Sequence, residues 1–226
     1  MIIKKISLLA ASIIKVFILV FYFDFDSKAE EQNIKYYSND KGVLSLMYHR
    51  FNENKYPSTN IQMDIFHDQM EIIKNSGYEF YDPGSFINEF EKPKDKKKIL
   101  ITIDDGFKSF YNNAWPYLKK NKIPFILFVS TEAIGKNGYM TWNEIKEIEQ
   151  SKLGYIGHHS HSHEYLIDMN EEEFINDIET ATKIFKTKLG YVPSIFSYPF
   201  GEYSLYMKNY ILKKFEYAFG QHSGII

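Results

Sequence analysis

Two short clusters of acidic and imidazole side chains each follow an apolar stretch of the sequence. Asp104 and Asp105 come directly after residues 99–103, and four histidines lie within His158-His159-Ser160-His161-Ser162-His163. Carboxylates and imidazoles bind divalent transition metals, and the chain has no cysteine that could supply a thiolate. The two clusters therefore predict a metal site built from aspartate and histidine.

The spacing within the second cluster points to a particular pair of ligands. His159 and His163 are four residues apart, so one turn of helix would place both rings on one face. One aspartate with two histidines forms a facial triad that leaves coordination positions open. Zn²⁺ is the default ion, with Co²⁺, Ni²⁺, Mn²⁺ and Fe²⁺ as alternatives. Without a metal, the same residues would form a solvated histidine-rich loop and an aspartate that caps a helix.

A metal ion with open positions favours hydrolysis. Such an ion polarises a carbonyl and lowers the pKa of bound water toward about 7. An aspartate that does not bind the ion can take a proton from that water, and a histidine can protonate the leaving group. The sequence shows no glycine-rich nucleotide-binding loop, because neither GxGxxG nor GxxxxGK[ST] occurs. The formal net charge of −2 gives no electrostatic case for binding nucleic acid.

Short apolar segments alternate with amphipathic ones along the chain, which predicts a parallel β/α architecture. We expect strands at 43–48, 78–81, 99–103, 124–129, 153–157, 194–198 and 217–219. We expect helices at 60–75, 83–90, 107–120, 141–150, 171–189 and 203–215. Six or seven strands fit a distorted or incomplete barrel better than an open sheet. Both polar clusters then lie at carboxyl ends of strands, where such folds hold their active sites.

Residues 1–29 are typical of an export segment. Two lysines precede the apolar residues 6–23, which only Lys15 interrupts, and Ala29 is a plausible cleavage position. The alternative is an uncleaved anchor that attaches the protein to a membrane through residues 6–23. Residues 30–42 are then a polar spacer and residues 43–226 the folded domain. We therefore expect a periplasmic, envelope-associated or secreted protein.

Three segments resemble the motifs of the polysaccharide deacetylase superfamily, also known as NodB-homology domains or carbohydrate esterase family 4. Residues 102–106 are similar to its T-F-D-D-G motif, which implies Asp104 as general base and Asp105 as metal ligand. Residues 159–163 match H-[ST]-x-[ST]-H, which implies His159 and His163 as ligands. The resemblance extends over roughly residues 43–223 and implies a distorted (β/α)7 barrel.

The third motif carries a departure from the family pattern. Ser197-Tyr198-Pro199-Phe200-Gly201 resembles R-x-P-Y-G, which walls the acetyl pocket and offers a backbone N–H to the oxyanion, but it lacks the arginine. Tyr198, Pro199, Phe200 and Gly201 of this motif are predicted to bind substrate, and so is Trp142. Aromatic rings near predicted strand ends could also stack on sugars: Trp142, Tyr139, Tyr198, Phe200 and Tyr203.

The usual source of the general acid, a late Leu-x-x-His element, is not evident. Residues 46–51 instead resemble the N-terminal motif of exopolysaccharide deacetylases that act on poly-N-acetylglucosamine, which implies His49 as general acid. A structural histidine at a strand end is the alternative for His49. Chains of that subgroup continue where this one stops at Ile226, so a barrel truncated at the C-terminus is a second expectation.

The resemblance implies a metal-dependent hydrolase that removes N-acetyl groups from N-acetylglucosamine units of an extracytoplasmic polysaccharide. Two alternatives remain open. The missing arginine and short C-terminus are also compatible with a catalytically weak, glycan-binding member of the fold. A deacetylase of O-acetyl esters, peptidoglycan or lipid A sugars would keep the chemistry and change the substrate.

Overall fold

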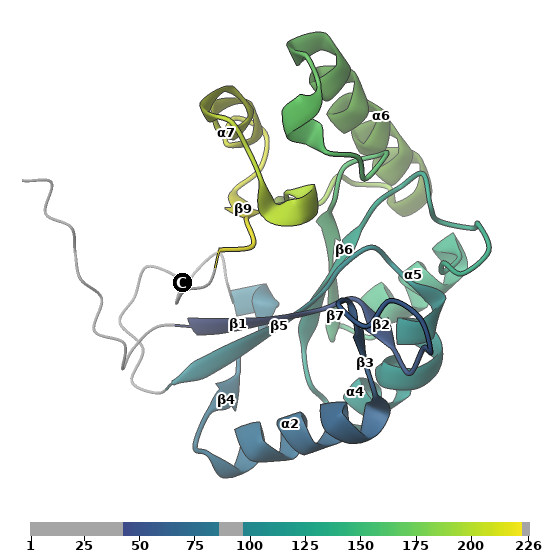
Figure 1. Ribbon diagram of the computed structural model, residues 1–226, viewed down its shortest axis with the longest axis vertical. Coiled ribbons are helices and arrows are strands. Elements are labelled where there is room, and N and C mark those ends of the chain that lie inside the picture. The colour runs from purple at the N-terminus through teal and green to yellow at the C-terminus, as the bar shows by residue number, and fades with distance from the viewer. Residues whose placement is uncertain (1–42, 86–96, 223–226) are drawn as a thin grey trace, which may run out of the picture. The chain divides into compact units, whose positions relative to one another are not determined.

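The computed structural model describes residues 43–85 and 97–222 (Figure 1). The predicted export segment, the spacer and most of the predicted helix at 83–90 lie outside these residues. Within the described part of the chain, no helix is long and apolar enough to cross a membrane. The folded domain expected from residue 43 onward is therefore described from its first strand.

A seven-stranded parallel sheet forms the centre of the domain, in the order β1-β5-β6-β7-β8-β9, with β4 also paired to β5. Lys98 of β5 pairs with Val43 of β1 and with Glu79 of β4, so these two strands lie on opposite edges of β5. The strands are β1 Val43–Tyr48, β4 Glu79–Phe80, β5 Lys98–Ile103, β6 Phe125–Val129, β7 Gly154–His158, β8 Ile195–Ser197 and β9 Tyr217–Phe219. The sheet curls into a half-barrel, which confirms the predicted barrel-like α/β fold.

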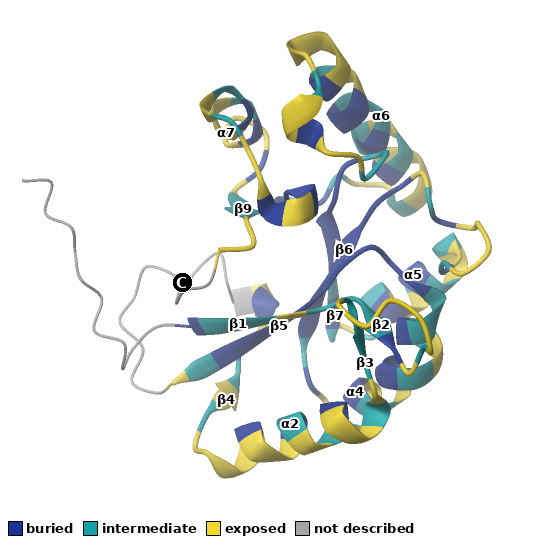
Figure 2. Ribbon diagram, in the orientation of Figure 1, coloured by how far each residue is buried: buried dark blue, intermediate teal, exposed yellow. Residues whose placement is uncertain are grey.

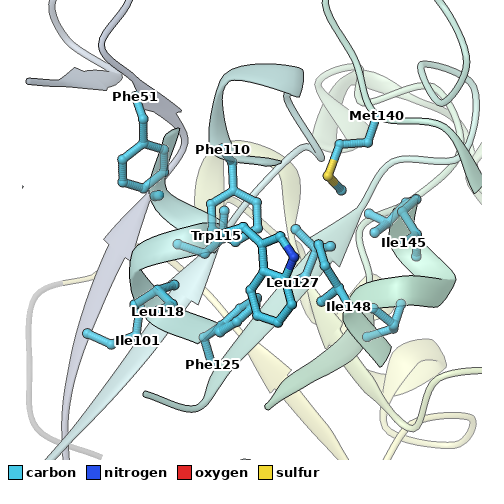
Figure 3. Close-up of a cluster of buried hydrophobic side chains, with 14 of the residues drawn as sticks. Phe51, Ile101, Phe110, Trp115, Leu118, Phe125, Leu127, Met140, Ile145 and Ile148 are labelled. Atoms are coloured by element: carbon cyan, nitrogen blue, oxygen red, sulfur yellow. The ribbon is translucent and has the colours of Figure 1, made fainter. Parts of the chain in front are cut away.

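Successive side chains of a strand point to opposite faces of the sheet, so the strands contribute to two apolar layers, one on each face. On β5, Ile101 and Ile103 belong to the layer beneath the helices, and Leu100 belongs to the layer on the other face with Phe128 and Ile195. Figure 3 shows the first layer, where side chains of the strands meet those of α4 and α5. β5 and β6 are thus buried over most of their length (Figure 2).

Helices α5 and α6 begin and end where the sequence predicts. Thr141 and Glu144 form a capping box at α5, and Asn170 caps α6, which stops at the left-handed Gly190. The helices are α2 Met63–Asn75, α4 Trp115–Asn121, α5 Trp142–Gln150, α6 Glu171–Leu189 and α7 Leu205–Ile211, with 3-10 turns η1 Pro83–Ser85, η3 Leu166–Asp168 and η4 Pro199–Gly201. Helices α2 and α7 are shorter than the predicted 60–75 and 203–215.

Two local features differ from expectation. The predicted helix at 107–120 begins as a π-helical turn, η2 Phe110–Ala114, before α4. Pro116 has no N–H to donate to the preceding turn, and it lies in the first turn of α4, where this is tolerated. A second, two-stranded sheet joins β2 Arg50–Phe51 to β3 Asn60–Ile61, and strands of two residues leave no periodic signal in the sequence.

Candidate metal centre

The two polar clusters meet at the carboxyl ends of two parallel strands, β5 and β7, which lie on either side of β6. Asp104 and Asp105 follow β5, and the histidine loop follows β7. Asp105 has a left-handed backbone, φ 72°, and so does Gly106, φ 78°, so the chain turns sharply out of β5. A Cβ on Gly106 would lie 2.9 Å from Ile134 Cδ1, so both backbone conformation and space favour glycine. This turn lets both carboxylates face the same site.

The structure brings the three predicted ligands together. Asp105, His159 and His163 offer ligand atoms that all lie within 4.8 Å of one another. His163 Nε2 is 2.9 Å and His159 Nε2 is 3.4 Å from Asp105 Oδ1. Asp105 Oδ1 and His159 Nε2 are nevertheless buried without a properly oriented hydrogen bond to any described residue. Converging buried donor atoms that lack partners fit a divalent cation.

His159 is held in the orientation that such a ligand needs. Its ring is fully buried, and Nδ1 lies 2.8 Å from the backbone oxygen of Ser197. Because a carbonyl oxygen only accepts, Nδ1 carries the hydrogen, and Nε2 is the nitrogen that faces Asp105. Burial would lower the pKa of His159, but the carboxylates of Asp105 and Asp104 raise it above its usual value. The site therefore favours positive charge.

The carboxyl of Asp105 shows the complementary effect. Burial would raise its pKa, but contacts with His159 and His163 bring it well below the usual range. Asp105 is thus an anion facing two imidazole nitrogens. This charge state is the one in which a carboxylate binds a metal ion.

Asp104 lies beside the cluster without joining it. Its side chain is 1% exposed, and neither carboxylate oxygen has a hydrogen-bond partner among the described residues. Its Oδ2 lies 4.0 Å from His159 Nε2. Burial raises the pKa of Asp104, opposed by the nearby charges of His159 and His49. Asp104 N also donates to the backbone oxygen of Tyr48 at 2.8 Å, so His49 follows β1 at the strand end beside the predicted base.

The histidine loop is not a turn of helix, which corrects the expectation for His159 and His163. Ser160 and His163 have left-handed backbones, with φ of 65° and 57°. The N–H of His163 bonds to Ser160 Oγ at 3.1 Å instead of an i−4 carbonyl. Two non-glycine residues in this strained region indicate a conformation imposed by the surroundings.

Those surroundings are the end of β6 and the helix α6. Ser130 Oγ donates to the backbone oxygen of His159 at 2.8 Å, and Glu132 N donates to that of His161 at 3.0 Å. On the other side, the buried carboxylate of Asp177 accepts from the N–H of His161 at 2.8 Å and of Ser162 at 2.9 Å. Backbone groups of the loop are thus bonded to distant residues, so no helical ladder forms.

The other two histidines of the cluster have structural partners. His158 is fully buried among Phe185, Phe196 and Phe215, and its Nδ1 accepts from Ser160 N at 3.1 Å. Burial lowers the pKa of His158 to about 3. His161 Nδ1 lies 2.8 Å from Thr131 Oγ1. Of the four rings, only those of His159 and His163 belong to the candidate metal cluster.

The third motif lies next to the cluster. The Phe200 ring is 5.0 Å from that of His163 and stacks on Tyr165 at 4.0 Å. Tyr198 is 2% exposed and stacks on Tyr203 at 4.7 Å, and Pro199 and Gly201 are buried in the turn between them. Trp142 instead packs against Phe185 of α6, with ring centroids 5.8 Å apart, within the helix-covered layer.

Sequence reasoning missed Ser130 and Asp177. Asp177 left a signal, because it lies three residues after Phe174 and one before Ile178, on the apolar face of α6. A carboxylate on a buried face requires hydrogen-bond donors, which here come from the loop. A cavity of about 430 Å³ opens beside the cluster and is lined by Asp105, His163 and Ser130 among others.

Comparisons with known proteins agree with this geometry. The chain is 27% identical over 161 residues to YxkH of Bacillus subtilis, covering 70% of this chain and 57% of that protein. It is 25% identical over 201 residues to a poly-beta-1,6-N-acetyl-D-glucosamine N-deacetylase of Staphylococcus epidermidis, covering 80% and 69%. The solved structure of IcaB from Ammonifex degensii aligns with TM-score 0.74 at 27% identity, covering 81% and 85%.

The family model described as polysaccharide deacetylase matches residues 91–220, more than half of the chain. This range includes Asp104, Asp105 and the histidine loop, which the structure places together at the strand ends. The chain therefore belongs to the polysaccharide deacetylase family.

Proposed function

We propose that this protein is a metal-dependent N-deacetylase that removes acetyl groups from N-acetylglucosamine units of an extracytoplasmic polysaccharide. The observation that carries the proposal is the cluster of Asp105, His159 and His163 with the unpartnered carboxylate of Asp104 beside it. Similarity to a relative named for N-deacetylation of poly-beta-1,6-N-acetyl-D-glucosamine supports the choice of glycan.

Asp105, His159 and His163 would hold the metal, with Zn²⁺ as the first choice of ion. When bound, the ion supplies Lewis acidity that polarises an acetyl carbonyl and lowers the pKa of water. The protein prepares the site by fixing the tautomer of His159 through Ser197 and by keeping Asp105 ionised. The protein's own hydrogen bonds and charges thus orient the atoms that would bind the ion.

Asp104 would act as general base and His49 as general acid. A carboxylate with both oxygens buried and unpartnered is free to accept a proton from water, and burial raises its proton affinity. The hydrogen bond from Asp104 N to the backbone oxygen of Tyr48, the residue before His49, supports placing the acid at the same site. Phe200, whose ring lies next to that of His163, would wall the acetyl group together with Tyr198 of the same motif.

The test is acetate release from N-acetylglucosamine oligomers by the purified protein supplied with Zn²⁺, Co²⁺ or Ni²⁺. We expect release with at least one ion and a loss of about 10²–10⁴-fold in Asp104→Asn, the usual range for a general base. Metal content should be the same in both proteins, since Asp104 lies outside the cluster. No release with any ion, or wild-type activity in Asp104→Asn, would overturn the proposal.

Ser197, in place of the arginine of the third motif, keeps a second candidate function open. A glycan-binding protein without turnover would bind the oligomers in wild type and in Asp104→Asn and release no acetate from either. Deacetylation of O-acetyl esters, peptidoglycan or lipid A sugars would appear as a higher kcat/KM in a panel of those substrates. We also propose that residues 1–29 direct export, which N-terminal sequencing and fractionation of the expressed protein would test.

A further inference from the structure

The cavity beside the candidate metal centre extends along a row of side chains that the proposed chemistry does not use. Besides Asp105 and His163, it is lined by Arg50, Tyr56, Phe107 and Tyr139. Arg50 belongs to β2, and Tyr56 to the connection between β2 and β3. Arg50 falls within the motif at residues 46–51, whereas Tyr56 lies outside every motif that the sequence indicates.

The four side chains form a continuous stack. The Arg50 guanidinium carbon lies 3.5 Å from the centre of the Phe107 ring and 4.3 Å from that of Tyr56. On the far side, Phe107 packs on Tyr139 with centroids 4.9 Å apart. A backbone bridge also pairs Phe107 with Tyr139. The guanidinium therefore lies within cation–π distance of two rings.

Arg50 is the single arginine among 27 lysine and arginine residues. Its side chain is 18% exposed, and Nη1 donates to Glu53 at 3.1 Å. Among the described residues, no other guanidinium N–H of Arg50 has an acceptor, and none of these nitrogens is fully buried. Since Arg50 lines the cavity, these donors remain available to oxygen atoms of a ligand.

Tyr56 is presented to solvent at a conformational cost. Its side chain is 55% exposed, and its φ of 61° lies in the left-handed region. That region costs a bulky L-residue about 1–2 kcal/mol. Its backbone oxygen accepts from Thr59 N at 3.0 Å, which stabilises the turn. An exposed ring held in a strained conformation at a cavity is typical of a binding residue rather than of core packing.

The charges around the cavity favour a neutral ligand. Arg50 is paired with Glu53, and Lys136, the other cation lining the cavity, is paired with Glu132 at 2.7 Å. Glu164 adds a further carboxylate to the lining. The cavity thus offers hydrogen-bond donors and aromatic faces without an excess of positive charge, which matches sugar hydroxyl and amide groups better than an anionic glycan.

We propose that this stack is a second sugar subsite, which binds the N-acetylhexosamine residue adjacent to the one that is deacetylated. The inference rests on the proposed function. Tyr56 packs on a face of that sugar, and Arg50 donates hydrogen bonds to its hydroxyl or acetamide oxygens. The subsite selects a neutral, N-acetylated chain over a single sugar and over an acidic polymer.

The test is calorimetric binding of a β-1,6-linked N-acetylglucosamine tetramer to the full chain, in an Asp104→Asn background that prevents turnover. Tyr56→Ala and Arg50→Lys should each weaken binding by roughly tenfold, as expected for losing a binding hot spot. Tyr191→Ala, an exposed tyrosine at the end of α6, is the matched control and should bind like its parent. An oligogalacturonate of equal length should not compete.

The subsite is overturned if the parent protein does not bind the tetramer or if Tyr56→Ala and Arg50→Lys bind it as tightly as Tyr191→Ala. A second measurement separates this from the proposed function. With Asp104 intact, hydrolysis of 4-nitrophenyl acetate should stay within about twofold in both variants, because the ester needs only the metal end. Tetramer binding that depends on Tyr56, with no acetate release by wild type, would support the subsite and contradict the deacetylase.

Discussion

Nδ1 of His159 lies 2.8 Å from the backbone oxygen of Ser197, which joins the carboxyl ends of β7 and β8. This contact fixes which nitrogen of His159 carries the hydrogen. It also connects the histidine loop to the third motif at the residue where the family pattern has arginine. The serine side chain is absent from this bond, so the position contributes to the site through its backbone.

Asp177→Asn should weaken metal binding by about 10–100-fold, the range for residues that orient metal ligands. The carboxylate accepts from His161 N and Ser162 N, and an amide keeps only one acceptor oxygen. The measurement is a competition titration with a metal indicator. Asp168→Asn removes one exposed carboxylate and should bind like wild type.

The same variant separates positioning from catalysis. If Asp177 acts through the loop, saturating metal should restore most of the kcat of Asp177→Asn, leaving the metal affinity as the main defect. Equal metal affinities in Asp177→Asn and Asp168→Asn would show that the two hydrogen bonds do not hold the loop.

His158 should make the metal-free protein less stable in acid. Its pKa is lowered from 6.5 to about 3 by burial, so between these values the unfolded chain binds a proton that the folded protein excludes. The free energy of unfolding then falls as the pH decreases, by up to about 1.4 kcal/mol per pH unit from this residue. His158→Phe cannot bind a proton in either state.

Urea unfolding in the presence of a chelator, at several pH values from 6.5 downward, measures this contribution. We expect a shallower dependence of unfolding free energy on pH in His158→Phe than in wild type. The slope is compared rather than the stability itself, since the substitution also removes the acceptor for Ser160 N. Parallel slopes would mean that His158 is protonated in the folded protein.

Gly157→Ala should destabilise the sheet just before the histidine loop. An added Cβ would lie 2.3 Å from Cδ1 of Phe128, whose ring is 1% exposed and has little room to move. Overpacking of this kind costs about 1–3 kcal/mol. Urea unfolding should show this loss, whereas Gly220→Ala, with its nearest contact at 3.3 Å, should lose less. Equal stabilities would indicate that Phe128 repacks freely.

The sequence predicts the elements that local patterns determine. Residues 99–103 form β5 because five apolar or β-branched residues in a row suit a strand buried on both faces. Thr141 with Glu144 and Asn170 with Gly190 mark helix ends through side-chain and backbone chemistry that acts within a few residues. The candidate ligands Asp105, His159 and His163 could also be predicted, because residue type and spacing can be read from the sequence itself.

What the sequence does not predict depends on contacts between distant residues. The left-handed backbones of Ser160 and His163 follow from hydrogen bonds to β6 and to Asp177, which lies on another element. The spacing of His159 and His163 therefore suggests a helix that does not form. Trp142 packs on Phe185 for the same reason, because only the folded chain brings α5 and α6 together.

The most direct test of the central claim is the metal content of the purified protein after incubation with Zn²⁺ and removal of free ion. We expect about one ion per chain in wild type and in His161→Ala, whose ring contacts Thr131. We expect loss of the ion in His163→Ala, which removes a ligand from the cluster. A wild-type protein that binds no ion, or a His163→Ala protein that binds it as wild type does, would mean that these residues do not form a metal site.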